Sequence, residues 1–261
     1  MNENIITVVD FRNKLFDLFR ELNAEDAKLF KYYLADPSKR PKRTNLFLGT
    51  VGKQAVWKNG ERKFTRWPKW KDDRDKDKCL LMQLHKKLYP ELYTSNNDNS
   101  ALPNRCSYVK EEPWELVWFE NMKFDCTYLS NRRILRKAIT KSYPIAWSYD
   151  WIIEVENEFE EFAFTLRTLL DVNCNRRMAF FFTDDVKNDD FVDKINEMFD
   201  PAWKLYSSSE YTNFIANTDL CLHALIFPDT FEDIKHYLDN TKLVKWDSTK
   251  EEFLLEPQYN S

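Results

Sequence analysis

The chain has 261 residues, of which 43% are hydrophobic and 31% are charged. This length and composition predict a globular protein with one large or two small domains and argue against a disordered chain. The formal net charge is -4, yet residues 38–88 contain 16 Lys and Arg against five acids. Such an uneven distribution of charge predicts an anionic partner for the amino-terminal third.

Scarce residue types argue against several functional classes. The three glycines all lie between Gly49 and Gly60, whereas the phosphate-binding loops of P-loop NTPases and dinucleotide-binding enzymes need glycine at several positions. The five cysteines form no CxxC pair and the three histidines have no metal-ligand spacing, so we expect reduced, structural thiols. With neither a secretory signal nor an apolar run long enough for a bilayer, we expect a cytoplasmic protein without a membrane partner.

The amino-terminal region, residues 1–100, is predicted to consist of helices and a β-hairpin. Apolar spacing over residues 8–34 predicts two short helices, and a further helix is expected over residues 79–88. Between them, Asn59-Gly60 is the dipeptide that a type I′ hairpin turn favours, because both central residues of that turn need positive φ. Residues 91–113 are polar and contain proline, and they mark the boundary to a second domain over residues 101–261.

Basic and aromatic residues alternate on both sides of the Asn59-Gly60 turn. Lysine and arginine neutralise phosphates and aromatic rings stack on bases, so the hairpin is a candidate nucleic-acid interface. The candidate residues are Lys58, Arg62, Lys63, Arg66 and Lys69, to which a basic helix predicted over residues 131–144 adds Arg133 and Lys137. A solvated hairpin and a plain surface helix are the alternatives.

The second region alternates apolar runs with helical patterns. Residues 114–119 predict a strand or a short helix, and strands are expected at residues 149–157 and 176–185, with a helix between them. This βαβ order implies a parallel pair with a right-handed crossover. A helix, a third buried strand at residues 219–227 and a closing helix over residues 231–240 follow. The predicted fold is therefore mixed α/β, with a partly parallel sheet flanked by helices.

A run of acids accompanies the first of these strands, in the sequence DWIIEVENEFEEF at residues 150–162. Because side chains alternate along a strand, Glu154 and Glu156 share a face and lie roughly 7 Å apart, within reach of one divalent cation. Asp150 lies roughly 13 Å from Glu154, so another ligand is needed. Asp184 and Asp185 end the next strand, and the carboxyl ends of parallel strands meet at one edge. Carboxylate oxygens favour Mg²⁺ or Mn²⁺, and such a site beside basic surfaces predicts phosphodiester hydrolysis.

The same acids also have a structural explanation. Asn157 can cap the following helix, with Glu158, Glu160 and Glu161 stabilising the helix dipole in its first turn. This explanation does not cover Glu154, which is expected inside an apolar strand, where an unpaired carboxylate is costly. A metal site and a buried ion pair therefore both stay open for this residue. The cations that could form the ion pair are Arg132, Arg133, Arg136 and Arg167.

Glu154-Val155-Glu156 on a strand, followed by a helix and a second apolar strand, resembles the core of PD-(D/E)XK, or restriction-endonuclease-like, nucleases over residues 130–183. That core has an acid on one strand, an acid-x-Lys or acid-x-acid motif on the next, and an amphipathic helix after it. The resemblance implies that Glu154 and Glu156 bind metal and that Arg167 supplies the cation of the missing lysine. The family's earlier acid would be Asp150, with Asp125 or Glu120 as alternatives.

We therefore predict a nuclease that acts on DNA, depends on Mg²⁺ or Mn²⁺, and serves in restriction or phage defence if the resemblance extends that far. The predicted catalytic residues are Asp150, Glu154, Glu156 and Arg167, and the three acids are the predicted metal ligands. The alternative is a non-catalytic interaction protein with a degenerate nuclease-like fold, and a homodimer or a protein partner stays open. A nuclease requires a second carboxylate within ~5 Å of that of Glu154 at an open crevice.

Overall fold

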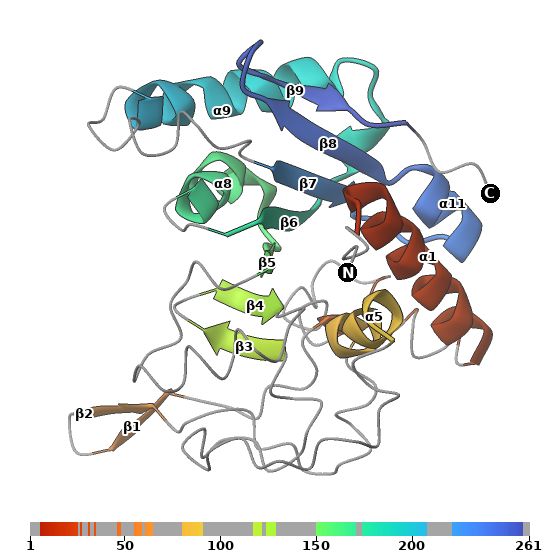
Figure 1. Cartoon of the computed structure of the whole chain (residues 1–261). Coiled ribbons are helices and arrows are strands. Elements are labelled where there is room, and N and C mark those ends of the chain that lie inside the picture. Colours follow the sequence, from red (N-terminus) through yellow and green to blue (C-terminus); the bar gives the residue numbers. More distant parts are fainter. Residues whose placement is uncertain are drawn as a thin grey trace, which may run out of the picture.

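The computed structural model describes residues 6–25, 27, 31, 34, 46–47, 55–58, 61–64, 80–90, 117–121, 124–128, 150–170, 174–207 and 221–257. These residues form a mixed α/β fold, as predicted, with helices on both faces of a seven-stranded sheet (Figure 1). The helices in this part of the chain are α1 (Val8–Glu25), α5 (Leu80–Leu88), α8 (Phe162–Leu170), α9 (Phe191–Ser207) and α11 (Ile234–Asp239). The strands of the sheet are β3 (Val117–Asn121), β4 (Phe124–Tyr128), β5 (Trp151–Val155), β6 (Arg176–Phe182), β7 (Leu222–Phe227), β8 (Lys242–Asp247) and β9 (Glu252–Leu255).

The strands are ordered along the sheet as they are along the chain, from β3 to β9. β3, β4 and β5 form an antiparallel meander, and β5, β6 and β7 are parallel. The crossovers of the two parallel pairs contain α8 and α9, which confirms the predicted βαβ unit at β5, α8 and β6. β8 and β9 then continue the sheet in antiparallel fashion. The carboxyl ends of three neighbouring strands thus meet at one edge.

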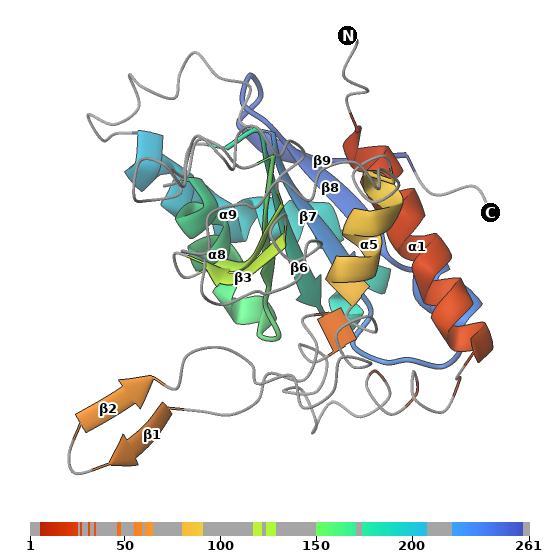
Figure 2. The same ribbon diagram turned by 60° about the horizontal axis from the view of Figure 1, so that its bottom comes forward.

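Two hydrophobic clusters, one on each face, hold the helices to the sheet. α1, α5 and α11 cover one face, and α8 and α9 cover the other (Figure 2). The alternation along β6 shows why: Phe180 and Phe182 pack under α1 and α5, whereas Ala179 and Phe181 face α8 and α9. The predicted amino-terminal region therefore contributes α1 and α5 to the same core as the strands of the second region.

Helix α1 begins with a capping box. Thr7 Oγ1 accepts a hydrogen bond from Asp10 N at 3.0 Å, and the Asp10 carboxylate accepts one from Thr7 N at 3.0 Å. The hydrogen bonds from Thr7 lower the pKa of Asp10. Phe11, Leu15 and Phe19 follow at helical spacing and are fully buried. This is the first of the two helices predicted for residues 8–34, and most of the second lies outside the described residues.

Other elements differ from the predictions in instructive ways. The predicted closing helix, α11, is followed by β8 and β9, which were not predicted, and β4 was not predicted either. The amino-terminal hairpin is present as β1 (Ala55–Lys58) and β2 (Glu61–Phe64), whose register pairs Lys58 with Glu61 across a two-residue connection. Strand β9 ends the sheet, and the Asn196 side chain of α9 accepts from Phe253 N at 2.5 Å and donates to its carbonyl at 3.2 Å. This contact occupies part of an edge that would otherwise be open to another strand.

None of the helices in the described ranges is both long enough and apolar enough to cross a membrane.

Candidate functional site

A pair of carboxylates lies across the junction of β4 and β5. The β4–β5 register ends at Cys126 and Ile153, and its extension by one residue places Asp125 opposite Glu154. Glu154 Oε2 accepts a hydrogen bond from Asp125 N at 2.9 Å, and Asp125 Oδ2 accepts one from Val155 N at 2.8 Å. Directly opposite residues share a face of the sheet and have Cβ atoms about 5 Å apart. The structure thus brings a second acid to Glu154.

The row of acids extends to the neighbouring strand. In the β3–β4 register, Phe119 pairs with Cys126 and Asn121 with Phe124, so the backbone of Glu120 lies opposite that of Asp125. Glu120, Asp125 and Glu154 therefore occupy equivalent positions on three adjacent strands. The described side chains contain no group of three or more His, Cys, Asp and Glu that could hold a metal ion. The side chain of Glu120 lies outside that set, so the acids whose side chains the structure describes here are Asp125 and Glu154.

The face that this pair occupies follows from the strand alternation. Trp151, Ile153 and Val155 of β5 pack under α1 and α5, and Ile152 packs under α8. Glu154 therefore lies on the α8 side and is half-buried, as is Asp125. A carboxylate that is half-buried beside an apolar core is held in position while keeping access to solvent. Such a pair has the oxygen donors that Mg²⁺ or Mn²⁺ prefers.

Glu156 lies one residue beyond the end of β5. Its backbone N–H continues the ladder to Phe180 O at 2.9 Å, and its Oε1 accepts from Glu158 N at 3.0 Å. The predicted Asn157 cap is wrong, since the N-cap is Glu158, which makes no side-chain capping hydrogen bond. Glu160 and Glu161 do lie in the first turn, a 3₁₀ turn over Phe159–Glu161 that leads into α8. Part of the acid run therefore does open a helix, as its structural explanation requires.

Asp150 lies at the opposite, amino-terminal end of β5. Its Oδ1 is 2.6 Å from Arg176 Nη1 and accepts from Asn175 Nδ2 at 3.2 Å, and its Oδ2 accepts from the Tyr89 hydroxyl. Only 7% of Asp150 is exposed. Burial, followed by the charge of Asp150 and its hydrogen bond, raises the pKa of Tyr89. The structure thus gives Asp150 a buried ion pair and does not bring it together with Glu154 and Glu156, contrary to the predicted metal set.

Arg167, the predicted catalytic cation, lies on α8. Its Nε is buried and has no hydrogen-bond partner among the described residues. No ion pair joins it to Glu154 in that part of the chain, so the structure does not show the predicted contact. The other arginines proposed as partners of Glu154, namely Arg132, Arg133 and Arg136, lie outside the described residues.

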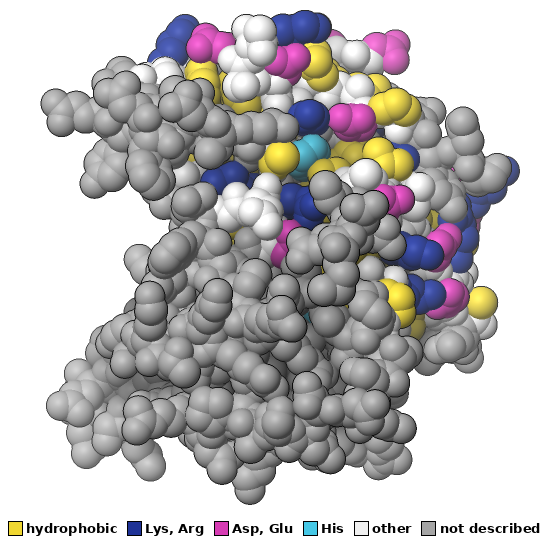
Figure 3. All heavy atoms as spheres, viewed as in Figure 1, with side chains coloured by type: hydrophobic (Ala, Val, Ile, Leu, Met, Phe, Trp, Pro, Cys, Tyr) yellow, Lys and Arg dark blue, Asp and Glu magenta, His cyan; other side chains and the backbone are white. Residues whose placement is uncertain are grey.

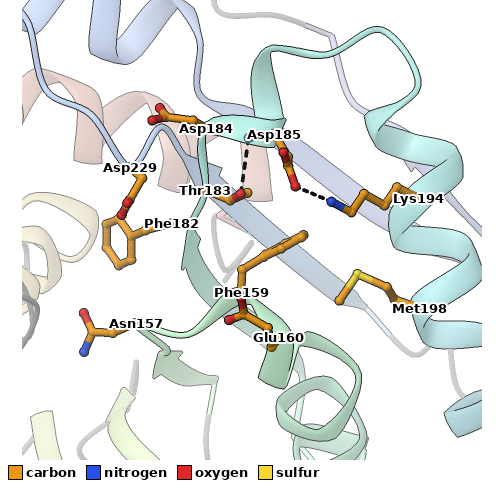
Figure 4. Close-up of a pocket in the computed structure, with 10 residues that line it drawn as sticks. All are labelled: Asn157, Phe159, Glu160, Phe182, Thr183, Asp184, Asp185, Lys194, Met198 and Asp229. Atoms are coloured by element: carbon orange, nitrogen blue, oxygen red, sulfur yellow. Dashed lines mark hydrogen bonds and ion pairs between the residues drawn. The ribbon is translucent and has the colours of Figure 1, made fainter. Parts of the chain in front are cut away.

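A pocket of about 330 Å³ opens at the carboxyl edge of the sheet, where β5, β6 and β7 end (Figure 4). Asn157 and Glu160 line it from the segment after β5, Lys194 and Met198 from α9, and Asp229 from the segment after β7. Asp184 and Asp185 reach the same edge, as the parallel order predicted. Asp185 pairs with Lys194, whereas the carboxylate of Asp184 points away from that pair (Figure 4).

The environment of Asp184 explains its protonation state. Burial raises the pKa of this carboxyl, but hydrogen bonds from Thr230 Oγ1 at 2.5 Å and Thr230 N at 3.2 Å, with the Lys187 ammonium, outweigh that effect. The pKa is therefore below its ordinary value. Because Lys187 and Lys194 hold the carboxylates of Asp184 and Asp185, the structure does not add these two acids to the pair on β4 and β5.

The predicted nucleic-acid contacts have only partial structural coverage. Lys58, Arg62 and Lys63 lie on the β1–β2 hairpin, of which the backbone alone is described, and Arg66, Lys69, Arg133 and Lys137 lie outside the described residues. On the described part of the face in Figure 3, Lys and Arg side chains are interspersed with Asp and Glu. That part of the surface shows no large area of one charge in this view.

The comparisons with known proteins are negative, since no protein-family model, curated protein or solved structure matches the chain.

Proposed function

We propose that the protein is a metal-dependent nuclease that acts on DNA, in which Asp125 and Glu154 are ligands of Mg²⁺ or Mn²⁺. One observation carries the proposal: the two acids lie directly opposite each other on adjacent antiparallel strands, each fixed by a hydrogen bond from a backbone N–H. Carboxylates at opposite positions on adjacent strands repel each other, and together they offer several oxygens to one cation. A divalent cation removes that repulsion while keeping both groups ionised.

The order of elements around the pair supports the same function. An acid on β4, an acid-x-acid motif at Glu154 and Glu156, helix α8 and the parallel strand β6 follow one another as in the nuclease core that the sequence resembles. In this proposal Asp125 takes the role first considered for Asp150, because Asp150 is bound to Arg176 at the other end of β5. Glu120 is the candidate for a third ligand, from its position in the row.

The acid pair and Glu156 have different tasks in this proposal. Bound between them, the metal would supply an activated water and neutralise charge on the phosphate. Asp125 and Glu154 hold the ion at a fixed position because each is tied to the backbone of the other's strand. Glu156, two residues after Glu154, is the candidate acceptor of a proton from that water, and its Oε1 accepts a hydrogen bond from Glu158 N at 3.0 Å.

The proposal is tested by incubating plasmid and single-stranded DNA with the purified protein in Mg²⁺ or Mn²⁺. We expect cleavage by the wild type and a loss of at least 100-fold, on the order of 3 kcal/mol in the barrier, in Asp125→Asn and in Glu154→Gln. Glu161→Gln is the matched control, because Glu161 is exposed on the 3₁₀ turn and should leave the rate unchanged. Thermal unfolding of each variant shows that a loss of cleavage does not come from a loss of the fold.

One observation favours a non-catalytic interaction protein instead. The carboxylates of Asp125 and Glu154 replace ladder hydrogen bonds where β4 and β5 separate, and this alone gives both residues a structural purpose. If wild-type protein cleaves no DNA in any divalent metal, and if titration shows no binding of Mn²⁺ that depends on Glu154, the structural purpose is sufficient and the nuclease proposal fails.

A further inference from the structure

We infer that the pocket at the carboxyl edge of the sheet binds a single unpaired nucleobase that carries an amino group, as cytosine and adenine do. The inference rests on the proposed function, because it assigns to the nuclease a substrate with an unstacked nucleotide beside the cleaved phosphate. It adds a binding site that is separate from the metal ligands. Enzymes that bind such a base hold it between apolar side chains and recognise its hydrogen-bonding edge.

The size of the pocket and part of its lining fit a single nucleobase. Its volume of about 330 Å³ is at the lower end for small-molecule sites, which is large enough for a base and too small for a paired duplex. Phe159, Phe182 and Met198 contribute the apolar part of the lining. Both rings belong to rigid clusters, since Phe159 stacks on Phe191 at 5.8 Å and Phe182 stacks on Phe227 at 5.5 Å. The apolar walls are therefore fixed in position before any ligand arrives.

The polar lining selects hydrogen-bond donors. Glu160 and Asp229 carry carboxylates, which accept hydrogen bonds only, and the Asn157 amide has an acceptor oxygen. Carboxylates accept from the amino group of cytosine, and an asparagine amide pairs with adenine. Lys194, the cation of the lining, is held by Asp185. A phosphate therefore meets net negative charge in the pocket, whereas an amino-bearing base meets acceptors.

The distance between the pocket and the acid pair suits one nucleotide. Asn157 is three residues after Glu154, and three residues span at most roughly 10 Å. That distance is comparable with the reach from a phosphate to the outer edge of its own base. A strand whose phosphate is bound at Asp125 and Glu154 can therefore place the neighbouring base in the pocket, if that base is not paired.

Binding of free nucleosides tests the inference without any cleavage. We expect cytidine to shift NMR signals of pocket residues in the wild type and to bind at least fivefold more tightly than cytidine 5′-monophosphate. Met198→Trp fills the pocket and should weaken cytidine binding at least tenfold, and Glu160→Ala, at an exposed position, should weaken it about threefold. Glu197→Ala is the control, since Glu197 neighbours Met198 on α9 but is exposed outside the pocket.

Three outcomes of this titration would overturn the inference. Tighter binding of the monophosphate than of the nucleoside would contradict the charge argument. Equal cytidine binding in the wild type and in both pocket variants would place the ligand elsewhere. Displacement of cytidine by equimolar spermidine would assign the pocket to an organic cation.

A cleavage experiment separates this inference from the proposed function. A single-stranded oligonucleotide with one abasic position should be cut at least tenfold more slowly at the adjacent linkage than the same strand with cytosine there. Unchanged cleavage at the abasic position would refute the pocket inference and leave the nuclease proposal intact. Cytidine binding that depends on Met198, in a protein that cuts no DNA, would support the pocket and refute the nuclease proposal.

Discussion

The two ends of strand β5 use acids in opposite ways. At the amino-terminal end, Asp150 is buried and bound to Arg176, Tyr89 and Asn175, so its charge is compensated within the fold. At the carboxyl-terminal end, Glu154 and Asp125 are half-buried, and each accepts a hydrogen bond from a backbone N–H. The first arrangement joins elements together, whereas the second places two like charges side by side.

The contacts at the amino-terminal end of β5 stabilise the fold, whereas the proposed metal site lies at its carboxyl-terminal end. An ion pair with excellent geometry fixes the amino end: Arg176 lies over the Trp151 ring at 5.1 Å, and Trp151 Nε1 donates to the Tyr89 hydroxyl at 3.1 Å. α5 is thereby tied to the sheet through Tyr89, which follows it. At the carboxyl end, two half-buried carboxylates accept hydrogen bonds from backbone N–H groups of the neighbouring strand instead.

The largest expected effect is the loss of stability when the amino-end ion pair is broken. Asp150→Ala leaves the Arg176 guanidinium and the Tyr89 hydroxyl without their carboxylate in a site that water hardly reaches. We expect the free energy of unfolding to fall by about 3 kcal/mol, measured by urea denaturation. Glu197→Ala, an exposed acid on α9, is the control and should change it by less than about 0.5 kcal/mol. A loss below 1 kcal/mol for Asp150→Ala would show that the two ends do not differ in this respect.

The second effect concerns the carboxyl end and depends on metal. If Asp125 and Glu154 hold Mn²⁺, the ion stabilises the folded protein by about 2.7 kcal/mol at one hundred times its dissociation constant. We expect thermal unfolding to shift upward with Mn²⁺ in the wild type and not in Glu154→Gln. An equal Mn²⁺ shift in both proteins would place the ion elsewhere.

Some strands of the sheet were predictable from the sequence and others were not. The βαβ unit was predictable because β5 and β6 are apolar runs on either side of an amphipathic helix. β4 was not, because its sequence FDCTY is only five residues long and mixes polar with apolar positions. β8 and β9 follow a helix that looked final and are joined by a tight turn, where Glu251 has a φ of 56° without being glycine.

The site was predicted in part. Glu154 and its alternation with buried residues were readable from period two alone. The pairing of these acids across the sheet was not, because the register between β4 and β5 depends on contacts between residues 23 to 27 positions apart. Without that register, Asp150 was the nearest acid that precedes Glu154 in the sequence, although Asp125 lies opposite Glu154 on the neighbouring strand. The partner of Asp150, Arg176, was equally hidden, since it starts the neighbouring parallel strand.

A third effect concerns stability at alkaline pH and two residues near the amino-terminal ends of β5 and β6, Tyr89 and Cys174. Burial raises the pKa of the Cys174 thiol to about 11, from an ordinary 9.0, and also raises the pKa of Tyr89. The unfolded chain therefore loses these protons before the folded chain does, so stability falls as pH rises from about 9 to 11. Cys174→Ala should remove part of this loss, on the order of 2 kcal/mol, in urea denaturation at pH 8 and pH 10.5. A loss of the same size in the variant would mean that other groups cause it.

The smallest effect concerns stability at acid pH and Asp184, which follows β6 at the carboxyl edge of the sheet. The pKa of Asp184 is lowered, because hydrogen bonds from Thr230 and the ammonium of Lys187 outweigh the opposing effect of burial. This group therefore adds stability above the ordinary pKa of 3.8, and that stability is lost as pH falls through the lower folded value. In Thr230→Val the pKa of Asp184 should rise toward its ordinary value, as measured by NMR titration of the carboxyl carbon, and acid unfolding should begin at a slightly higher pH. Thr249→Val, at an exposed turn position, should change neither quantity. Cys174→Ala should leave the acid transition unchanged. If it shifted that transition as much as Thr230→Val does, the loss of stability at acid pH could not be assigned to Asp184.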